Sequence, residues 1–132
     1  MKYLLDTNIC IYIIKKKPKS IIEKFITFSA GEIGISSITL AELEYGVAKS
    51  QAREKNQTAL EKFLIPIDIY PFDDLAAIAY GKIRASLESK GTPIGSMDLL
   101  IAAHAVSLNL PIITNNTKEF DRVNGLLIEN WL

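Results

Sequence analysis

The sequence has few of the features that mark disulfide-bonded, zinc-binding or exported proteins. It contains one cysteine, Cys10, and one histidine, His104, in 132 residues. This scarcity excludes an internal disulfide and a zinc finger of the usual kind. The apolar N-terminal stretch is interrupted by Asp6 and Asn8 and is followed by lysines, the reverse of a secretory signal. The apolar run at residues 99–106 falls far below the roughly twenty residues that cross a bilayer. We therefore expect a soluble, cytoplasmic protein without membrane contact.

An excess of charge of one sign is also missing. Lysine plus arginine and aspartate plus glutamate both number 15, so the formal net charge is +0. Bulk charge therefore favours neither nucleic acid nor an acidic membrane as a partner. Glycine and proline are scattered singly, without a low-complexity tract or a repeat. A chain of this length buries roughly two-thirds of its unfolded surface in one core, and we expect a single domain over residues 1–132.

Short apolar runs alternate with segments of helical periodicity along the chain. The runs predict strands at residues 3–5, 33–35, 67–70 and 111–113, with 126–128 as a candidate fifth. Helical spacing begins near residue 9 and returns at 18–30, from 37, and at 53–64, 73–90 and 96–106. Parallel strands need crossover connections, which helices supply. This order predicts an α/β fold, a three-layer α/β/α domain with a central, mainly parallel sheet.

Two acidic residues follow predicted strands, where the ligands of such sheets gather. Asp6 comes directly after the first strand, and Glu119 lies in the segment TNNTKEF after the fourth. Both positions also suit a cap, because aspartate is a favoured helix N-cap. Asn116, three residues before Glu119, could cap the same turn. If the first and fourth strands are neighbours, Asp6 and Glu119 lie at the same edge of the sheet.

Glu42 lies on a helix face that the spacing predicts to be buried. It shares a stripe with Ile38, Ala41 and Tyr45. An unpaired buried carboxylate costs several kcal/mol, so a cation, a metal or a hydrogen-bond donor is needed there. A capping box with Thr39, three residues earlier, is the alternative explanation.

Asp98 repeats this pattern near the start of another predicted helix. Ile101 and Ala102, three and four residues further on, mark the apolar face of that helix. An acid in a first turn is also favoured by the helix dipole, without any metal. A ligand role and a capping role are compatible at this position.

Asp6, Glu42, Asp98 and Glu119 are so far apart in the sequence that only the fold can unite them. Clustered carboxylates repel one another and raise one another's pKa, and a cation is the natural neutraliser. Oxygen ligands favour Mg²⁺ or Mn²⁺, whereas zinc favours histidine and cysteine. The four acids therefore predict a divalent metal site.

Four segments resemble those of the VapC-type PIN-domain ribonuclease toxins of type II toxin-antitoxin systems. They are LLDTNI, SSITLAELEYG, GTPIGSMDLLIAAHA and IITNNTKEFDRVNGLLIENW, and they cover nearly the whole chain. The resemblance implies a single PIN-like domain with a five-stranded sheet that cleaves RNA with Mg²⁺, or with Mn²⁺, leaving 5′-phosphate and 3′-hydroxyl ends. By position it implies that Asp6, Glu42, Asp98 and Glu119 are the catalytic and metal-binding acids.

The resemblance leaves the fourth acidic position open. The wider PIN pattern often carries aspartate where this chain has Asn116. Either Glu119 supplies the fourth carboxylate, or Asn116 acts as a neutral ligand through water. Thr7, Ser96 and Thr114 match positions that orient the carboxylates and metal-bound water by hydrogen bonds.

The resemblance also implies partners. It implies a VapB-type antitoxin that covers the groove, a homodimer, a larger assembly with the antitoxin, and tRNA as substrate, with the anticodon loop of initiator tRNA as one target. Ile9, Ile13, Ile38 and Tyr45 form the expected docking surface. Apart from the four acids, 15 basic side chains stand against 11 acidic ones, so the remaining surface suits a phosphate backbone.

Two other functions fit parts of the pattern. A catalytically inactive PIN-like module that binds RNA or protein would use the acids only as caps. A Mg²⁺-dependent phosphatase would use the carboxylates but would carry a DxD motif after the first strand, where this chain has DTN.

Overall fold

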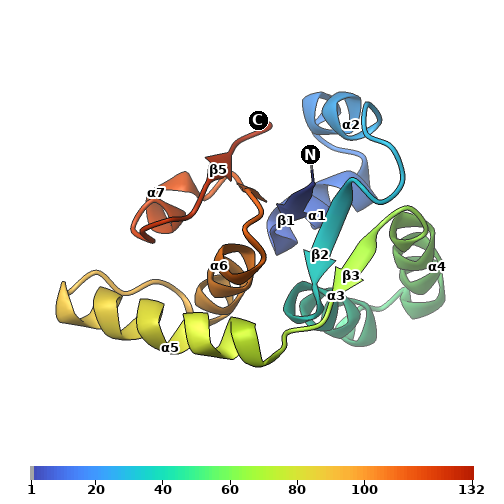
Figure 1. The fold of residues 1–132 in the computed structure, drawn as a ribbon. Coiled ribbons are helices and arrows are strands. Elements are labelled where there is room, and N and C mark those ends of the chain that lie inside the picture. Colours follow the sequence, from blue (N-terminus) through green and yellow to red (C-terminus); the bar gives the residue numbers. More distant parts are fainter. Residues whose placement is uncertain (1) are drawn as a thin grey trace.

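The computed structural model describes residues 2–132, and in that part of the chain strands and helices alternate (Figure 1). The strands are β1 (Tyr3–Leu5), β2 (Ile33–Ser36), β3 (Asp68–Tyr70), β4 (Ile112–Ile113) and β5 (Ile128–Glu129). The helices are α1 (Thr7–Lys15), α2 (Lys19–Phe25), α3 (Ser37–Lys49), α4 (Arg53–Leu64), α5 (Asp74–Ser89), α6 (Ser96–Leu108) and α7 (Thr117–Phe120). The predicted alternation is confirmed.

The strands form one five-stranded sheet in the order β3-β2-β1-β4-β5, and every neighbouring pair is parallel. The sheet is therefore parallel throughout. Leu4 in β1 pairs with Gly34 on one side and with Ile112 on the other. The first and fourth strands, β1 and β4, are neighbours, which is the condition for Asp6 and Glu119 to lie at the same edge of the sheet.

Helices cover both faces of the sheet, as the three-layer prediction requires. Leu5 and Ile113 point toward α1 to α4, where they join one buried cluster. Leu4 and Ile112 point to the opposite face, into a second cluster with α5, α6 and α7. Successive side chains of a strand alternate between faces, so both faces of β1 and β4 are apolar. Figure 1 shows α5 to α7 gathered on one side of the molecule and α1 to α4 on the other.

The predicted buried face of α3 is wrong. Tyr45 is 66% exposed and Ala41 is exposed, whereas Thr39 and Leu43 are the buried residues of this helix. Apolar residues occur on two stripes of α3, and spacing alone does not reveal which of them faces α1 and α4. Glu42 lies at the edge of the stripe that is buried, and it is half-buried.

A short helix, α7, occupies part of the polar segment after β4. Four residues are too few to give a helical period, so the sequence pattern does not predict α7.

Within residues 2–132, every helix lacks the length and the apolar character that a membrane-spanning segment needs.

Candidate active site

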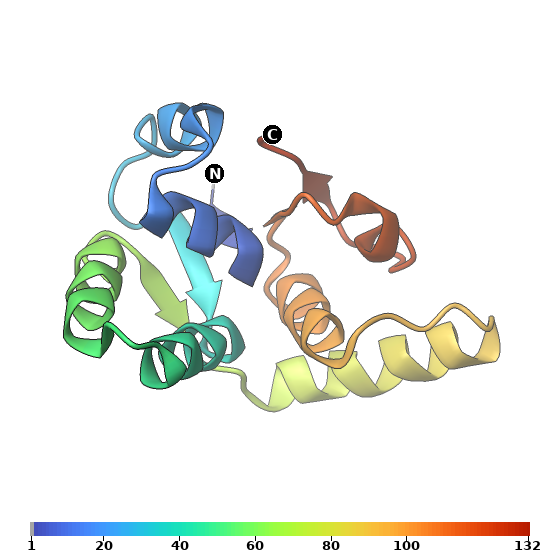
Figure 2. The ribbon, with the colours of Figure 1, turned by 180° about the vertical axis from the view of Figure 1, so that it is seen from behind.

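The four acidic residues extend from four different helices or helix starts near the carboxyl end of the sheet. Asp6 follows β1 and is the N-cap of α1, and Asp98 lies in the first turn of α6. Glu42 is on α3, and Glu119 is on α7. Figure 2 shows α1, α3 and α6 converging on the middle of the molecule. The parallel sheet thus collects residues that are far apart in the sequence.

The carboxylate of Asp6 is almost fully buried, with 3% of the residue exposed. Its Oδ1 accepts a hydrogen bond from the Ile9 backbone N–H at 2.9 Å, and its Oδ2 accepts one from Thr114 Oγ1 at 2.5 Å. Burial raises the pKa of Asp6, and the charge of Glu42 adds to that rise, while the two hydrogen bonds oppose it. Asp6 therefore caps α1 and also presents a carboxylate to the other acids.

The carboxylate of Glu42 is held by a threonine from another helix. Thr7 Oγ1 donates to Glu42 Oε1 at 2.6 Å and lies 3.4 Å from Thr39 Oγ1. The capping-box alternative is wrong, because the N-cap of α3 is Ser36, whose Oγ accepts the Ile38 N–H. Glu42 faces α1 and does not close the start of its own helix.

The pKa of Asp98 responds to the charges of the other three acids. Its pKa is raised to about 6, first by burial and then by a hydrogen bond with Glu119. The charges of Asp6, Glu119 and Glu42 raise that pKa further. The other three predicted acids therefore all act on Asp98.

Asn116 lies between two of these carboxylates. Its Nδ2 donates to Glu119 Oε2 at 2.8 Å and to Asp98 Oδ2 at 3.3 Å. Its backbone N–H donates to Thr114 Oγ1 at 2.9 Å. Asn116 stands at the N-cap position of α7, but its side chain bonds the two acids and not the helix backbone.

The hydrogen-bonding residues predicted from the sequence differ in their contacts. Thr7, Thr114 and Asn116 each bond at least one of the four acids. Ser96 is exposed at the first position of α6, and its hydroxyl bonds no other residue of the described chain. Sequence reasoning missed Thr39 as a neighbour of Thr7, because threonine in a helix gives no pattern that points to a site.

The donor set suits a hard divalent cation. Among residues 2–132, no three histidine, cysteine, aspartate or glutamate side chains form a ready-made metal-binding group. Mg²⁺ does not need such a cage, since it usually keeps several waters and binds one or two carboxylates together with substrate phosphates. Burial, and to a smaller extent the neighbouring carboxylates, raise the pKa of Asp6 and of Asp98, and a bound cation would favour their ionised forms. The residues therefore fit a hard divalent cation that keeps part of its water.

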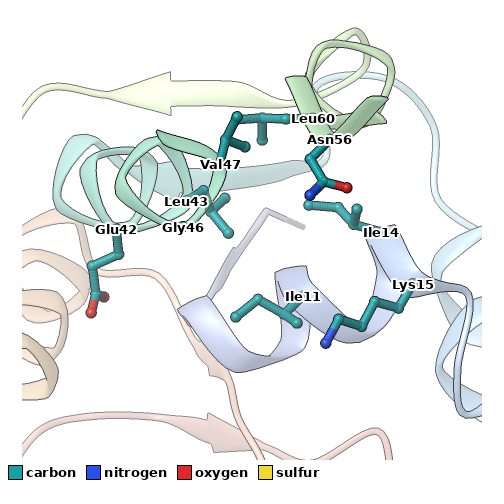
Figure 3. A pocket seen from close by; sticks show the side chains of 9 residues that line it. All are labelled: Ile11, Ile14, Lys15, Glu42, Leu43, Gly46, Val47, Asn56 and Leu60. Atoms are coloured by element: carbon teal, nitrogen blue, oxygen red, sulfur yellow. The ribbon is translucent and has the colours of Figure 1, made fainter. Parts of the chain in front are cut away.

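A largely apolar groove of about 270 Å³ adjoins one of the acids, Glu42 (Figure 3). Glu42 lies at one end, and Lys15 and Asn56 lie at the other. Its remaining lining residues are Ile11, Ile14, Leu43, Gly46, Val47 and Leu60. The docking surface expected from the sequence is wrong for two residues, because Ile9 and Ile13 are 0% and 6% exposed and belong to the core. The residues of α1 that line the groove are Ile11, Ile14 and Lys15.

Comparison with known proteins decides the family. The PIN domain model matches residues 3–126. The "tRNA(fMet)-specific endonuclease VapC" of Shigella flexneri is 50% identical over 131 residues, which cover 99% of this chain and 98% of that protein. This chain belongs to the VapC family of PIN-domain ribonucleases. The VapC resemblance, the PIN fold and the nuclease class predicted from the sequence are confirmed.

Two solved VapBC complexes have the same fold as this VapC chain. VapBC2 from Rickettsia felis, bound to a promoter DNA fragment, matches with a TM-score of 0.94 and 46% identity over 100% of both chains. DNA-bound VapBC from Salmonella typhimurium matches with a TM-score of 0.94 and 47% identity over 100% of this chain and 99% of that one. VapC nucleases belong to a family that is generally metal-dependent.

Proposed function

We propose that this VapC-family chain is the toxin of a type II toxin-antitoxin pair, an endoribonuclease that hydrolyses RNA phosphodiesters with Mg²⁺ or Mn²⁺. The single observation that carries the metal-dependent chemistry is the convergence of three other acids, Asp6, Glu42 and Glu119, on Asp98. Transfer RNA is the proposed substrate class, with the anticodon loop of initiator tRNA as the target. Support for that substrate comes from a relative named as a tRNA(fMet)-specific endonuclease at 50% identity.

In this proposal Asp6, Glu42, Asp98 and Glu119 hold the ion. When bound, the ion lowers the pKa of a water molecule and compensates charge on the phosphodiester. The acids must be ionised for this role, and the raised pKa of Asp98 means that its proton leaves near pH 6 in the free protein. A positive charge nearby favours that ionisation.

Threonine and asparagine side chains fix the acids in this proposal. Thr114 and the Ile9 N–H occupy one oxygen each of Asp6. Thr7 fixes one oxygen of Glu42. Hydrogen-bonded carboxylates keep one orientation, which preorganises a metal site before the ion binds. A role for Ser96 stays a prediction.

Asn116 and Glu119 divide the fourth role between them in this proposal. The amide nitrogen of Asn116 donates to both Asp98 and Glu119, so this side chain acts as a donor toward the acids. Glu119 then supplies the fourth carboxylate. By donating to both carboxylates, the amide offsets part of the repulsion between these neighbouring acids.

A cleavage assay tests the proposed activity. Purified, antitoxin-free protein is incubated with total tRNA in Mg²⁺, in EDTA, and in EDTA followed by excess Mg²⁺. Asp98→Asn is tested in parallel, and Asp121→Asn serves as the matched control because Asp121 is exposed. We expect discrete products from the wild type and from Asp121→Asn with metal only. Cleavage that survives both EDTA and an Asp6→Asn, Asp98→Asn double change would exclude the proposal.

A VapB-type antitoxin is the proposed occupant of the groove in Figure 3. The groove is suited to an amphipathic segment whose apolar side chains would cover Ile11, Ile14 and Val47. A basic side chain of that segment would neutralise Glu42 at the end of the groove. Related VapC chains occur in solved VapBC complexes. A homodimer, and a larger assembly with the antitoxin, stay proposals.

A substitution in the groove tests binding of the antitoxin separately from cleavage of RNA. Ile14→Asp places a charge in the groove, and Ile65→Asp is the control, because Ile65 is 82% exposed and does not line the groove. We expect Ile14→Asp to cleave tRNA normally but to resist inhibition by its antitoxin, with at least about tenfold weaker binding. Equal inhibition of both variants would exclude the groove as the docking site.

A further inference from the structure

His104 is a buried titratable residue to which the proposed chemistry assigns no role. It lies in α6 with 1% of its surface exposed, and it is the only histidine in the chain. Its Nδ1 lies 2.7 Å from Ser36 Oγ. Ser36 and His104 are 68 positions apart in the sequence, so this contact joins two elements that the sheet brings together.

Ser36 is the residue at which β2 ends and α3 begins. Its Oγ accepts the backbone N–H of Ile38 at 3.0 Å, which caps α3. The next residue, Ser37, accepts the backbone N–H of Phe72 at 3.0 Å. The ring of Phe72 meets the His104 ring edge-on at 5.3 Å. The imidazole therefore lies where α6, the start of α3 and the segment before α5 meet.

The hydrogen-bond pattern indicates which nitrogen of His104 carries the proton. Nε2 has no hydrogen bond of good geometry within residues 2–132, although the Pro71 carbonyl favours a proton on the ring. Burial lowers the pKa of His104, so the ring is neutral at pH 7. A proton on Nε2 leaves Nδ1 as the acceptor of the Ser36 hydroxyl, whose oxygen already accepts from Ile38. This tautomer satisfies Ser36 as donor and acceptor at once.

We propose that His104 is a positioning residue whose Nδ1 bond to Ser36 fixes α3 against α6. Ser36 precedes Glu42 by six positions, and His104 follows Asp98 by six positions. In a helix six residues span roughly 9 Å, so the bond ties the two helices about one and two-thirds turns from each acid. The charge of Glu42 already acts on Asp98. A shift of α3 along α6 would change their separation directly.

This inference rests on the proposed function only in taking Glu42 and Asp98 as the acids that hold the metal. The competing explanation is that His104 merely fills space. The two explanations differ in which substitutions they tolerate. Asparagine can place a polar atom near the position of Nδ1, whereas glutamine reaches the position of Nε2 and leaves Ser36 without its partner. A space-filling role treats both replacements alike.

The test compares His104→Asn with His104→Gln in the full-length protein. Three quantities are measured well below the melting temperature: kcat and KM on tRNA, Mn²⁺ affinity by calorimetry, and hydrogen exchange of the Ile38 amide in metal-free protein. We expect His104→Gln to lose about tenfold in kcat and in Mn²⁺ affinity, with KM nearly unchanged. The Ile38 amide should exchange faster in this variant. His104→Asn should stay close to the wild type in all three.

Two further variants separate positioning from stability. Ile101→Val removes a methylene from the same helix at a residue that is fully buried, and it should lower the melting temperature without changing Mn²⁺ affinity. In a Ser36→Ala background the difference between asparagine and glutamine at position 104 should vanish. Equal Mn²⁺ affinity and Ile38 exchange in the two His104 variants would overturn the inference, even where tRNA cleavage stands. Absence of wild-type cleavage would instead count against the proposed function, and the Ile38 exchange would still decide the role of His104.

Discussion

Thr114 and Asp6 are joined by a buried hydrogen bond of 2.5 Å, although they lie 108 positions apart in the sequence. Each follows one of two neighbouring strands, since Asp6 comes after β1 and Thr114 after β4. The bond opposes the rise in the pKa of Asp6 that burial causes. It therefore helps to keep a buried carboxylate ionised and in one orientation.

Thr114→Val tests this relationship. Valine keeps the shape of threonine but removes the hydroxyl, which donates to Asp6 and accepts from the Asn116 N–H. The pKa of Asp6 should therefore rise further and metal binding should weaken. We expect about tenfold lower cleavage at limiting Mg²⁺, with partial recovery at high Mg²⁺. Thr58→Val is the control, because Thr58 is exposed on α4. Equal Mg²⁺ dependence of the two variants would show that the bond has no role in metal binding.

Asn116 gives a second prediction, because its amide donates a hydrogen bond to each of two neighbouring acids. Asn116→Asp would put a third carboxylate beside Asp98 and Glu119 and replace two attractive contacts with repulsion. The metal-free variant should melt several degrees lower than the wild type, by about 1 kcal/mol or more in stability. Saturating Mn²⁺ should recover most of that loss, which thermal unfolding with and without the ion measures. A variant that melts like the wild type without metal would contradict the role given to the amide.

The pKa of Asp98 predicts an unusual pH dependence of stability. In the folded chain this pKa is about 6, whereas the ordinary value is 3.8. Between these values the folded chain binds more protons than the unfolded chain, so the free energy of unfolding falls as pH rises. After allowance for solvent screening at this half-buried group, the loss is on the order of 1–2 kcal/mol between about pH 4 and pH 6.

Denaturant unfolding at several pH values measures this effect. In Asp98→Asn the contribution of this group to the slope should disappear, and Asp121→Asn should leave it unchanged. Above about pH 6, Mg²⁺ should stabilise the wild type by mass action, because the ion binds only the ionised acids. A wild-type slope that equals that of Asp98→Asn in metal-free buffer would refute the account of charge crowding.

Much of the fold could be predicted because the sheet is parallel and buried. The apolar strands at residues 3–5, 33–35 and 111–113 are short and uninterrupted, and a helical segment follows each of the first two. Such a pattern has few solutions. Asp6 could be placed at the site for the same reason, since it ends a strand where such folds gather their ligands.

Other features could not be predicted from periodicity. The helix α3 carries two apolar stripes, and its spacing places Tyr45 on the buried face, whereas Leu43 is the residue in the core. The dual contact of Asn116 depends on how α7 and α6 pack, which no local pattern encodes. The contact between His104 and Ser36 joins residues 68 positions apart, so no local pattern in the sequence reveals it.

The most direct test of the central claim is the chemistry of the product ends. Transfer RNA cleaved by the purified wild type in Mg²⁺ is analysed for terminal phosphates, with Asp98→Asn as the background control. If a metal site formed by the four acids activates water, the products carry 5′-phosphate and 3′-hydroxyl ends. Products with 2′,3′-cyclic phosphate and 5′-hydroxyl ends would mean that the RNA's own 2′-hydroxyl attacks the phosphate. That result would contradict the account.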